Sequence, residues 1–412
     1  MAQRAKEKPK KPSVLVVGDG VVPTGFARVV HSILHELHSA YEFHHLAVNY
    51  SNQPHDLPWD VRAANQDGDY LGTNRLDATI AEVRPELVFL INDVWVIANY
   101  ADALRKHGSE LKVIAYSPVD AGPLEPGMVE GLLDLDAVVL YTEFGHREVD
   151  RAFAGCNGHV DRLPQTVVIP HGVDTNVFYP YARDDDGRLS PNGRRIARRE
   201  LFKHDEFANA FIVLNANRNQ PRKRIDITIK GFALFARDKP ANVKLYLHMG
   251  VEDLGWNVIA LARRHGIEDR LILTADLPHL PAVPDDTLNR IYNCCDVGVN
   301  TSIGEGWGLV SFEHAAAGGA QVVPRHSACE ELWSDAAVML EPCMSLTIEK
   351  TLGESHFVSP EEVARGLDSL YESPDLLAVV SAKSYETATR PEYRWPTIAG
   401  RWGALFDKTI SR

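Results

Sequence analysis

Cysteine is scarce in this sequence, and no two cysteines form a Cys-x-x-Cys pair. The residues are Cys156, Cys294, Cys295, Cys329 and Cys343. Adjacent Cys294 and Cys295 are poor disulfide partners, because neighbouring Cα atoms lie too close for relaxed geometry. A disulfide framework and a structural zinc site are both disfavoured. We expect buried, reduced thiols in a cytoplasmic protein.

Long apolar runs and an excess of basic charge are also missing. No run approaches the roughly 20 residues that a membrane-spanning helix needs. The sequence has 43 Lys and Arg against 56 Asp and Glu, a formal charge of −13. This charge argues against general nucleic-acid binding, which needs a basic face. Residues 1–12 are basic but lack the apolar segment of a secretion signal, so we expect a disordered tail with at most peripheral membrane contact.

The composition is that of an ordinary globular protein, and 412 residues suit two domains. Short apolar runs alternate with stretches of helical periodicity, which predicts α/β domains with parallel, covered sheets. The first series of expected strands is 13–18, 86–91, 111–117, 136–141 and 166–170, and the second is 210–216, 243–249, 270–275, 296–302 and 320–325.

Residues 181–195 are polar, contain Pro and Gly and lack periodicity, which is typical of a linker. We therefore predict two Rossmann-like, doubly wound domains, 13–180 and 196–392. Ligands of such sheets bind beyond the carboxyl ends of the strands. The chemistry is expected in a cleft where the two sheets face each other.

The loop 18–28 after the first expected strand resembles a dinucleotide fingerprint only superficially. Pro23 stands at the third glycine position and offers no N–H to a phosphate, so NAD binding is not expected. Gly25 precedes the following helix and permits close backbone approach of a ligand. A purely structural turn fits Gly25 equally well.

A cluster of cations follows the first expected strand of the second domain. Arg218 and Lys223 stand five positions apart, with Arg222 and Arg224 beside them. Cations at a strand's carboxyl end, before a helix, favour an anion site that a diphosphate would neutralise. A solvated basic surface is the alternative.

Two glutamates bracket a glycine-rich turn in EGWGLVSFEHAAAGG, residues 305–319. A helix starting near Trp307 would separate the carboxylates of Glu305 and Glu313 by about 10 Å. That separation suits hydroxyl groups at opposite ends of one extended ligand. Gly306 and Gly308 would let backbone N–H groups approach a phosphate between them. A dipole-complementing acid plus a surface glutamate is the plainer interpretation.

This region resembles the EGFGL-x-x-x-E-A segment of GT-B glycosyltransferases, in particular the retaining family 4. The spacing of Arg218 and Lys223 is similar to that family's R-x-x-x-x-K diphosphate clamp. VIPHGVDTNVF (168–178) and RWPTIAGRW (394–402) resemble its interdomain join and its final crossing segment. The resemblance covers nearly the whole chain.

The resemblance implies the GT-B fold, with an acceptor-side domain at 13–180 that the last helix, 393–412, rejoins. The donor domain is then 196–392. It also implies transfer of a sugar from a nucleoside-diphosphate sugar, UDP- or GDP-linked, to an acceptor hydroxyl. Anomeric configuration would be retained, and no metal or other cofactor is required. The acceptor class (glycan, lipid, protein or small molecule) is left open, and no specific nucleic-acid partner is evident.

The same resemblance assigns roles to single residues. Arg218 and Lys223 would hold the diphosphate and Glu305 the hydroxyls of the transferred sugar. Glu313 would bind the ribose. The further donor contacts would be Gly25, Gly306, Trp307, Gly308 and Leu309, and the candidate acceptor or sugar contacts are Asp120 and His171.

The sequence departs from the family at three positions. Val119 stands where many relatives carry a histidine, which leaves a non-catalytic nucleotide-sugar-binding protein as the alternative. Trp307 replaces a phenylalanine and could reshape the sugar pocket, and His314 replaces an alanine. The acidic run 184–186 resembles a metal-binding DxD motif, but its polar linker favours solvated charge, so no metal site is expected.

Overall fold

The computed structural model describes residues 10–65, 67–156, 163–184, 189–202 and 207–412. Of the predicted basic tail, residues 1–9 lie outside the described residues. Lys11 and Pro12 already contact the first domain, through hydrogen bonds from Lys11 Nζ to His38 O and from Glu42 N to Pro12 O.

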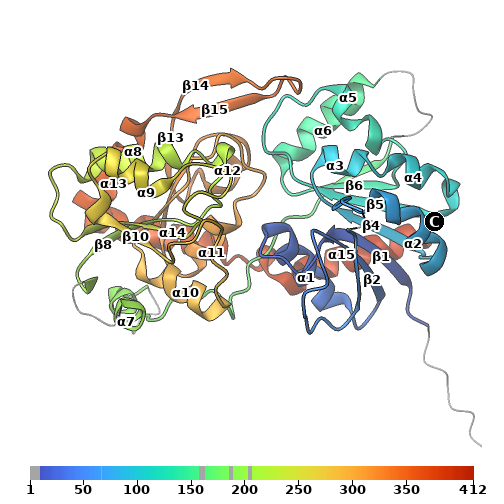
Figure 1. Ribbon diagram of the computed structural model, residues 1–412, viewed down its shortest axis with the longest axis horizontal. Coiled ribbons are helices and arrows are strands. Elements are labelled where there is room, and N and C mark those ends of the chain that lie inside the picture. Colours follow the sequence, from blue (N-terminus) through green and yellow to red (C-terminus); the bar gives the residue numbers. More distant parts are fainter. Residues whose placement is uncertain (1–9, 66, 157–162, 185–188, 203–206) are drawn as a thin grey trace, which may run out of the picture.

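The first domain is built on a seven-stranded parallel sheet in the order β3-β2-β1-β4-β5-β6-β7 (Figure 1). Its strands are β1 Ser13–Asp19, β2 Glu42–Val48, β3 Asp60–Ala63, β4 Leu87–Ile91, β5 Lys112–Ser117, β6 Ala137–Leu140 and β7 Gln165–Val168. The α-helices are α1 Gly25–Leu37, α2 Thr73–Val83, α3 Val94–Ala98, α4 Ala101–Arg105, α5 Pro126–Val129 and α6 Glu143–Gly155. The order reverses between β1 and β4, which is where doubly wound sheets bind ligands.

The second domain repeats this plan with a six-stranded parallel sheet in the order β10-β9-β8-β11-β12-β13. Its strands are β8 Phe211–Asn215, β9 Val243–Leu247, β10 Leu271–Leu273, β11 Val297–Val299, β12 Ala320–Pro324 and β13 Val338–Leu340. Its α-helices are α7 Pro191–Phe202, α8 Ile225–Ala236, α9 Val258–Arg264, α10 Asp285–Cys294, α11 Leu309–Ala316, α12 Ser327–Trp333, α13 Pro360–Glu372 and α14 Pro374–Ala388. An antiparallel hairpin, β14 Pro342–Thr347 and β15 Glu354–Val358, projects from this domain.

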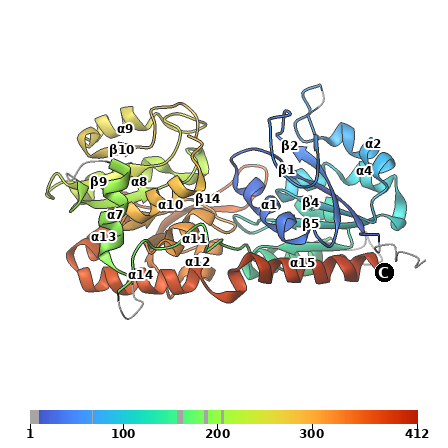
Figure 2. The same cartoon turned by 90° about the horizontal axis from the view of Figure 1, so that it is seen from below.

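The last helix, α15 Trp395–Ile410, crosses back to the first domain. Figure 2 shows α14 along the second domain and α15 along the first. Trp402 packs on Phe89 with ring centroids 4.7 Å apart, and Tyr41 donates a 2.7 Å hydrogen bond to Asp407. One hydrophobic cluster runs without a break from β1 through Trp307 and Phe312 into the second domain. The domains therefore share a core on the α14–α15 side.

The strands expected from apolar runs are all present, but several others escaped the sequence analysis. β2 contains the consecutive histidines His44 and His45, which break its apolar run. His45 is nevertheless fully buried, with Nε2 3.1 Å from Gly18 O. β3, β13 and the β14–β15 hairpin are short or exposed and give no clear periodic signal.

The expected linker 181–195 differs from the structure, because α7 begins at Pro191. Its arginines obscure the helical pattern. Arg194 and Arg198 face inward and both pair with Asp296, at 3.2 and 2.7 Å. Long basic side chains can lie against apolar surface while their guanidinium groups stay paired, so a polar sequence here forms a packed helix.

Candidate active site at the domain interface

Glu305 lies in the loop that joins β11 to α11. The loop ends at Gly308, whose φ of +89° favours glycine, and the helix begins at Leu309. The expected start near Trp307 is therefore two residues too early. Glu313 is in the middle of the helix, and both glutamates are buried, with exposed fractions of 5%.

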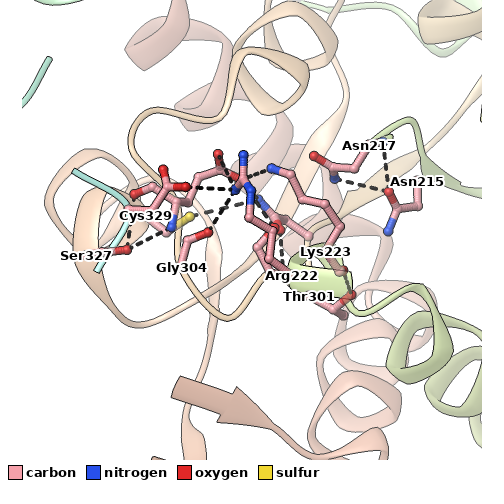
Figure 3. A network of polar contacts seen from close by, with 12 residues as sticks. Asn215, Asn217, Arg222, Lys223, Thr301, Gly304, Ser327 and Cys329 are labelled. Atoms are coloured by element: carbon pink, nitrogen blue, oxygen red, sulfur yellow. Dashed lines mark hydrogen bonds and ion pairs between the residues drawn. The ribbon is translucent and has the colours of Figure 1, made fainter. Parts of the chain in front are cut away.

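The Glu305 carboxylate is the centre of a buried polar network. Figure 3 shows Lys223 and Arg222 in this network. Oε2 lies 2.5 Å from Lys223 Nζ and accepts hydrogen bonds from Ser302 Oγ at 3.2 Å and Asn300 Nδ2 at 3.4 Å. Burial alone would raise the pKa of Glu305, but the charges of Lys223 and Arg222 outweigh it and lower the pKa to about 2. Glu305 is therefore ionised at any physiological pH.

Lys223 closes a 3₁₀ turn, Pro221–Lys223, directly before α8. Thr301, which follows β11, donates hydrogen bonds to the backbone carbonyls of Lys223 and Arg224. These contacts fix the basic loop against the end of β11. The fold thus brings together Lys223 and Glu305, which are 82 positions apart in the sequence.

The other predicted clamp residue, Arg218, is separate from this pair. It forms an ion pair with Asp253 at 2.8 Å, and its side chain is 46% exposed. Arg222 takes the position nearer Glu305: its Nη1 lies 3.8 Å from the Glu305 carboxylate and 3.3 Å from that of Asp120. The sequence analysis named Arg222 only as a neighbour, and the density of cations in this loop was the signal that pointed to it.

Asp120 lies in the first domain and contacts the Glu305 loop directly. Its carbonyl accepts a 2.9 Å hydrogen bond from Glu305 N. A Cβ at Gly306 would come within 2.6 Å of Pro118 and 2.9 Å of Asp120. Glycine at 306 therefore permits close approach of the two domains, and the facing sheet edges meet through direct contacts.

Glu313 joins a second set of interdomain contacts. Tyr292 donates a 2.8 Å hydrogen bond to it, and Arg28 of α1 lies 3.3 Å away. Arg28 also pairs with Asp285 at 2.7 Å. Burial raises the pKa of Glu313, while Arg28 and Tyr292 act against this rise. Gly25 is one turn earlier in α1, where a Cβ would lie 3.3 Å from Leu309. No motif in the sequence pointed to Arg28.

Two candidate contacts are buried in the shared aromatic core. His171 is 3% exposed, its Nδ1 lies 2.7 Å from Tyr116 OH, and burial lowers its pKa to about 3. The Trp307 indole, also 3% exposed, stacks on Phe312 with ring centroids 4.7 Å apart. The Trp307 side chain thus belongs to the aromatic core, and its effect on a sugar pocket stays a prediction. Its backbone remains beside Glu305.

His314 has a packing explanation. Its ring is fully buried and lies where a Cβ at Gly298 or Gly319 would clash, at 2.5 and 2.1 Å. Gln321 Nε2 is 3.0 Å from its Nδ1. The two glycines accommodate the larger side chain. Val119, where relatives carry a histidine, is likewise buried at 4% exposure.

Asp185 and Asp186 of the acidic run lie outside the described residues. Within the described ranges, no group of three or more His, Cys, Asp and Glu side chains is arranged to hold a metal ion. In the same part of the chain, no helix is both long and apolar enough to cross a bilayer.

No protein-family model matches the chain. Two D-inositol 3-phosphate glycosyltransferases match parts of it. The one from Geodermatophilus obscurus is 30% identical over 155 residues, which is 37% of this chain and 31% of the relative. The one from Thermobispora bispora is 26% identical over 263 residues, 60% of this chain and 51% of the relative. The matches thus span at most about half of these relatives.

Solved structures match nearly the whole chain. Sucrose-phosphate synthase from Thermosynechococcus elongatus superposes with a TM-score of 0.72 at 16% identity, covering 98% of this chain and 100% of that one. HepE from Anabaena, in complex with UDP and glucose, gives 0.68 at 17% identity, covering 96% and 100%. The chain has the GT-B fold, and its predicted resemblance to GT-B glycosyltransferases is confirmed at this level.

Proposed function

We propose that this protein is a glycosyltransferase that moves a sugar from a nucleoside-diphosphate sugar to an acceptor hydroxyl. The observation that carries the proposal is the buried Lys223–Glu305 pair, with Arg222 beside it, at the edge where two GT-B domains meet. The curated relatives are named as glycosyltransferases, and HepE was solved with UDP-glucose. A UDP- or GDP-linked hexose is the proposed donor.

The charges of the site suit the departure of a diphosphate. Lys223, Arg222 and Arg218 lie on the loop after β8, where negative charge on the leaving group would develop. Such cations can replace a metal ion in this role, and we propose that the reaction needs none. Glu305 and Glu313 have different partners, Lys223 and Arg28, which fits carboxylates that bind the sugar and the ribose at opposite ends of one donor.

The proposed step retains the anomeric configuration. The acceptor oxygen forms a bond to the anomeric carbon on the face that the diphosphate leaves. The bond from that carbon to the diphosphate oxygen breaks, and the acceptor proton passes to the departing diphosphate. Glu305 is ionised and held by Lys223, so its part is to orient the sugar hydroxyls and stabilise positive charge on the ring.

Donor entry requires the domains to separate. The side chains of Lys223 and Glu305 are only 8% and 6% exposed, and the backbone N–H of Glu305 donates a hydrogen bond to the carbonyl of Asp120. Opening of the two domains followed by closure over the donor would assemble the site and exclude water.

The test is a side-by-side assay of UDP-, GDP- and ADP-hexoses against a panel of hydroxyl acceptors, with detection of released nucleotide and glycosylated product. We expect turnover with one donor, and its loss in Lys223→Met and Glu305→Gln. Tight donor binding with no product from any acceptor would favour the alternative, a non-catalytic nucleotide-sugar-binding protein. The buried Val119, in place of the family histidine, is the observation behind that alternative.

A further inference from the structure

The loops at the carboxyl edge of the first sheet carry no Lys or Arg. These loops follow β1, β2, β4, β5, β6 and β7, are described throughout, and comprise residues 18–24, 49–58, 92–100, 117–125, 141–146 and 169–176. Their charged residues, His aside, are Asp19, Asp56, Asp93, Asp120, Glu125, Glu143 and Asp174. We call this edge the acidic wall. The basic wall opposite is the loop 216–224, which contains Arg218, Arg222, Lys223 and Arg224.

Three carboxylates of the acidic wall follow strands that are neighbours in the sheet. β1 pairs with β4 and β4 with β5, all in parallel, so Asp19, Asp93 and Asp120 emerge at one edge. Asp19 is already held by Thr24 Oγ1 at 2.5 Å and Asn49 Nδ2 at 3.0 Å. Burial, and then the nearby charge of Asp120, raise the pKa of Asp93 to about 6. Asp120 is paired with Arg222 of the basic wall, whereas the described residues show no ion pair within 4 Å for Asp93.

Two side chains beside these carboxylates independently suggest a ligand. The Tyr141 hydroxyl is buried, with the residue 4% exposed, and has no hydrogen-bond partner among the described residues. Tyr141 directly follows β6, which pairs with β5, so it emerges at the same sheet edge as Asp120. Burial raises the pKa of Tyr141, and the charges of Asp93, Asp120 and Asp19 add to this rise. Trp95 is 62% exposed on α3, two positions after Asp93, and its indole lowers the pKa of Asp93. A buried orphan hydroxyl is costly unless something satisfies it.

A bound donor would change the balance of charge between the walls. Arg222 of the basic wall pairs with Asp120. A diphosphate would compete for Arg222 and Lys223 and leave the carboxylates facing the acceptor. A phosphate or carboxylate on the acceptor would then meet like charges, and this repulsion disfavours such an acceptor. Hydroxyl groups, by contrast, can donate to carboxylates.

We propose that the acceptor is a polyhydroxylated molecule without phosphate or carboxylate, a sugar or cyclitol, held by Asp93, Asp120 and Tyr141 with its ring against Trp95. This inference rests on the proposed function and specifies its acceptor. It separates this chain from relatives named for phosphorylated compounds, D-inositol 3-phosphate glycosyltransferase and sucrose-phosphate synthase. Arg and Lys are the side chains that most often hold a phosphate, and the loops of the acidic wall contain neither.

The experiment compares matched acceptor pairs with the donor that gives turnover: myo-inositol against inositol 3-phosphate, and glucose against glucose 6-phosphate. We expect kcat/KM to be at least about tenfold higher for the unphosphorylated member. In Trp95→Ala we expect the acceptor KM to rise about tenfold while the donor KM stays unchanged. Asp93→Lys should shift the ratio toward the phosphorylated acceptor. Asp102→Asn is the matched control, because Asp102 is 91% exposed and pairs with Arg105 away from the wall.

Equal or higher kcat/KM for the phosphorylated acceptors would overturn this inference and leave the proposed function intact, since nucleotide would still be released. An unchanged ratio in Asp93→Lys would also overturn it. If the protein neither binds nor turns over any nucleotide sugar, the proposed function fails and the inference fails with it.

Discussion

The acidic wall and the basic wall have opposite charge and different degrees of internal pairing. On the basic wall, Lys223 is locked to Glu305 in a buried network with several partners. On the acidic wall, Asp93 and Tyr141 have few partners or none. A wall whose polar groups are already satisfied is preorganised for one ligand geometry. A wall with unsatisfied groups depends on its ligand, and this contrast suits a fixed donor site opposite a more variable acceptor site.

The largest expected effect comes from replacing Lys223 of the basic wall. Lys223→Met removes the cation beside the proposed leaving diphosphate and leaves Glu305 buried without its partner. We expect kcat to fall about 100- to 1000-fold, as for loss of one preorganised charge-stabilising group. Lys230→Met is the matched control, since Lys230 lies on the following helix α8, is 42% exposed and, among the described residues, pairs with Asp226. Equal rates in the two variants would remove Lys223 from the mechanism.

The next effect concerns the interdomain contact between Arg28 and Glu313. Because Arg28 opposes the burial-driven rise in the pKa of Glu313, Arg28→Gln should raise that pKa further. The carboxylate would then be protonated at a higher pH and lose its role as a hydrogen-bond acceptor. We expect donor affinity at pH 6 to fall about tenfold relative to pH 8 in this variant.

The comparison variant for Arg28 is Asp285→Asn, which keeps the contact between Arg28 and Glu313 but removes a carboxylate whose charge raises the pKa of Glu313. The pH dependence of its donor affinity should shift in the opposite sense, so that the affinity persists to a lower pH than in the wild type. If Arg28→Gln follows the wild-type curve, Arg28 does not tune the pKa of Glu313.

A smaller effect is expected in stability on the acidic wall. The pKa of Asp93 is raised from 3.8 to about 6, so the folded state holds its proton more tightly than the unfolded state. Stability is therefore lost as pH rises through about 6, where the folded protein must ionise a buried group. Asp93→Asn should raise the melting temperature by about 2–4 °C at pH 7.5 and change it little at pH 4. A gain that is equal at both pH values would argue against a titrating Asp93.

The smallest expected effect is on domain closure. Glu331 of α12 accepts hydrogen bonds from the backbone N–H groups of Glu143 and Phe144, at 2.9 and 2.6 Å, and so caps α6 of the other domain. Loss of a cap costs about 1 kcal/mol. Glu331→Gln should therefore increase hydrogen exchange at these two amides about fivefold, whereas exposed Glu330→Gln should not. Equal exchange in both variants would show that this contact does not hold the domains closed.

Much of the fold follows from the sequence, because buried parallel strands are continuous apolar runs. Two elements are exceptions. His44 and His45 interrupt the apolar run of β2, and the arginines of α7 obscure its helical periodicity. For the site, spacing within two separate loops predicted Arg218 and Lys223 in one and Glu305 in the other as candidates. It could not predict that Lys223 pairs with Glu305 while Arg218 pairs with Asp253, because both partners come from distant parts of the chain.

The interdomain contacts were the hardest to foresee. Arg28 and Asp120 meet the second domain only after both domains have folded and docked, and no local pattern records that geometry. The acidic wall can be recognised only once the strand order is known, because its residues come from loops that are spread over more than a hundred positions of the sequence.

The central claim is that the basic wall binds the donor and the acidic wall binds the acceptor. Its most direct test is the dissociation constant of the nucleoside diphosphate, measured by calorimetry at pH 7.5 for two variants. The account predicts at least about tenfold weaker binding in Lys223→Met and wild-type binding in Asp93→Asn. Equal affinities in both, or weaker binding in Asp93→Asn alone, would contradict it.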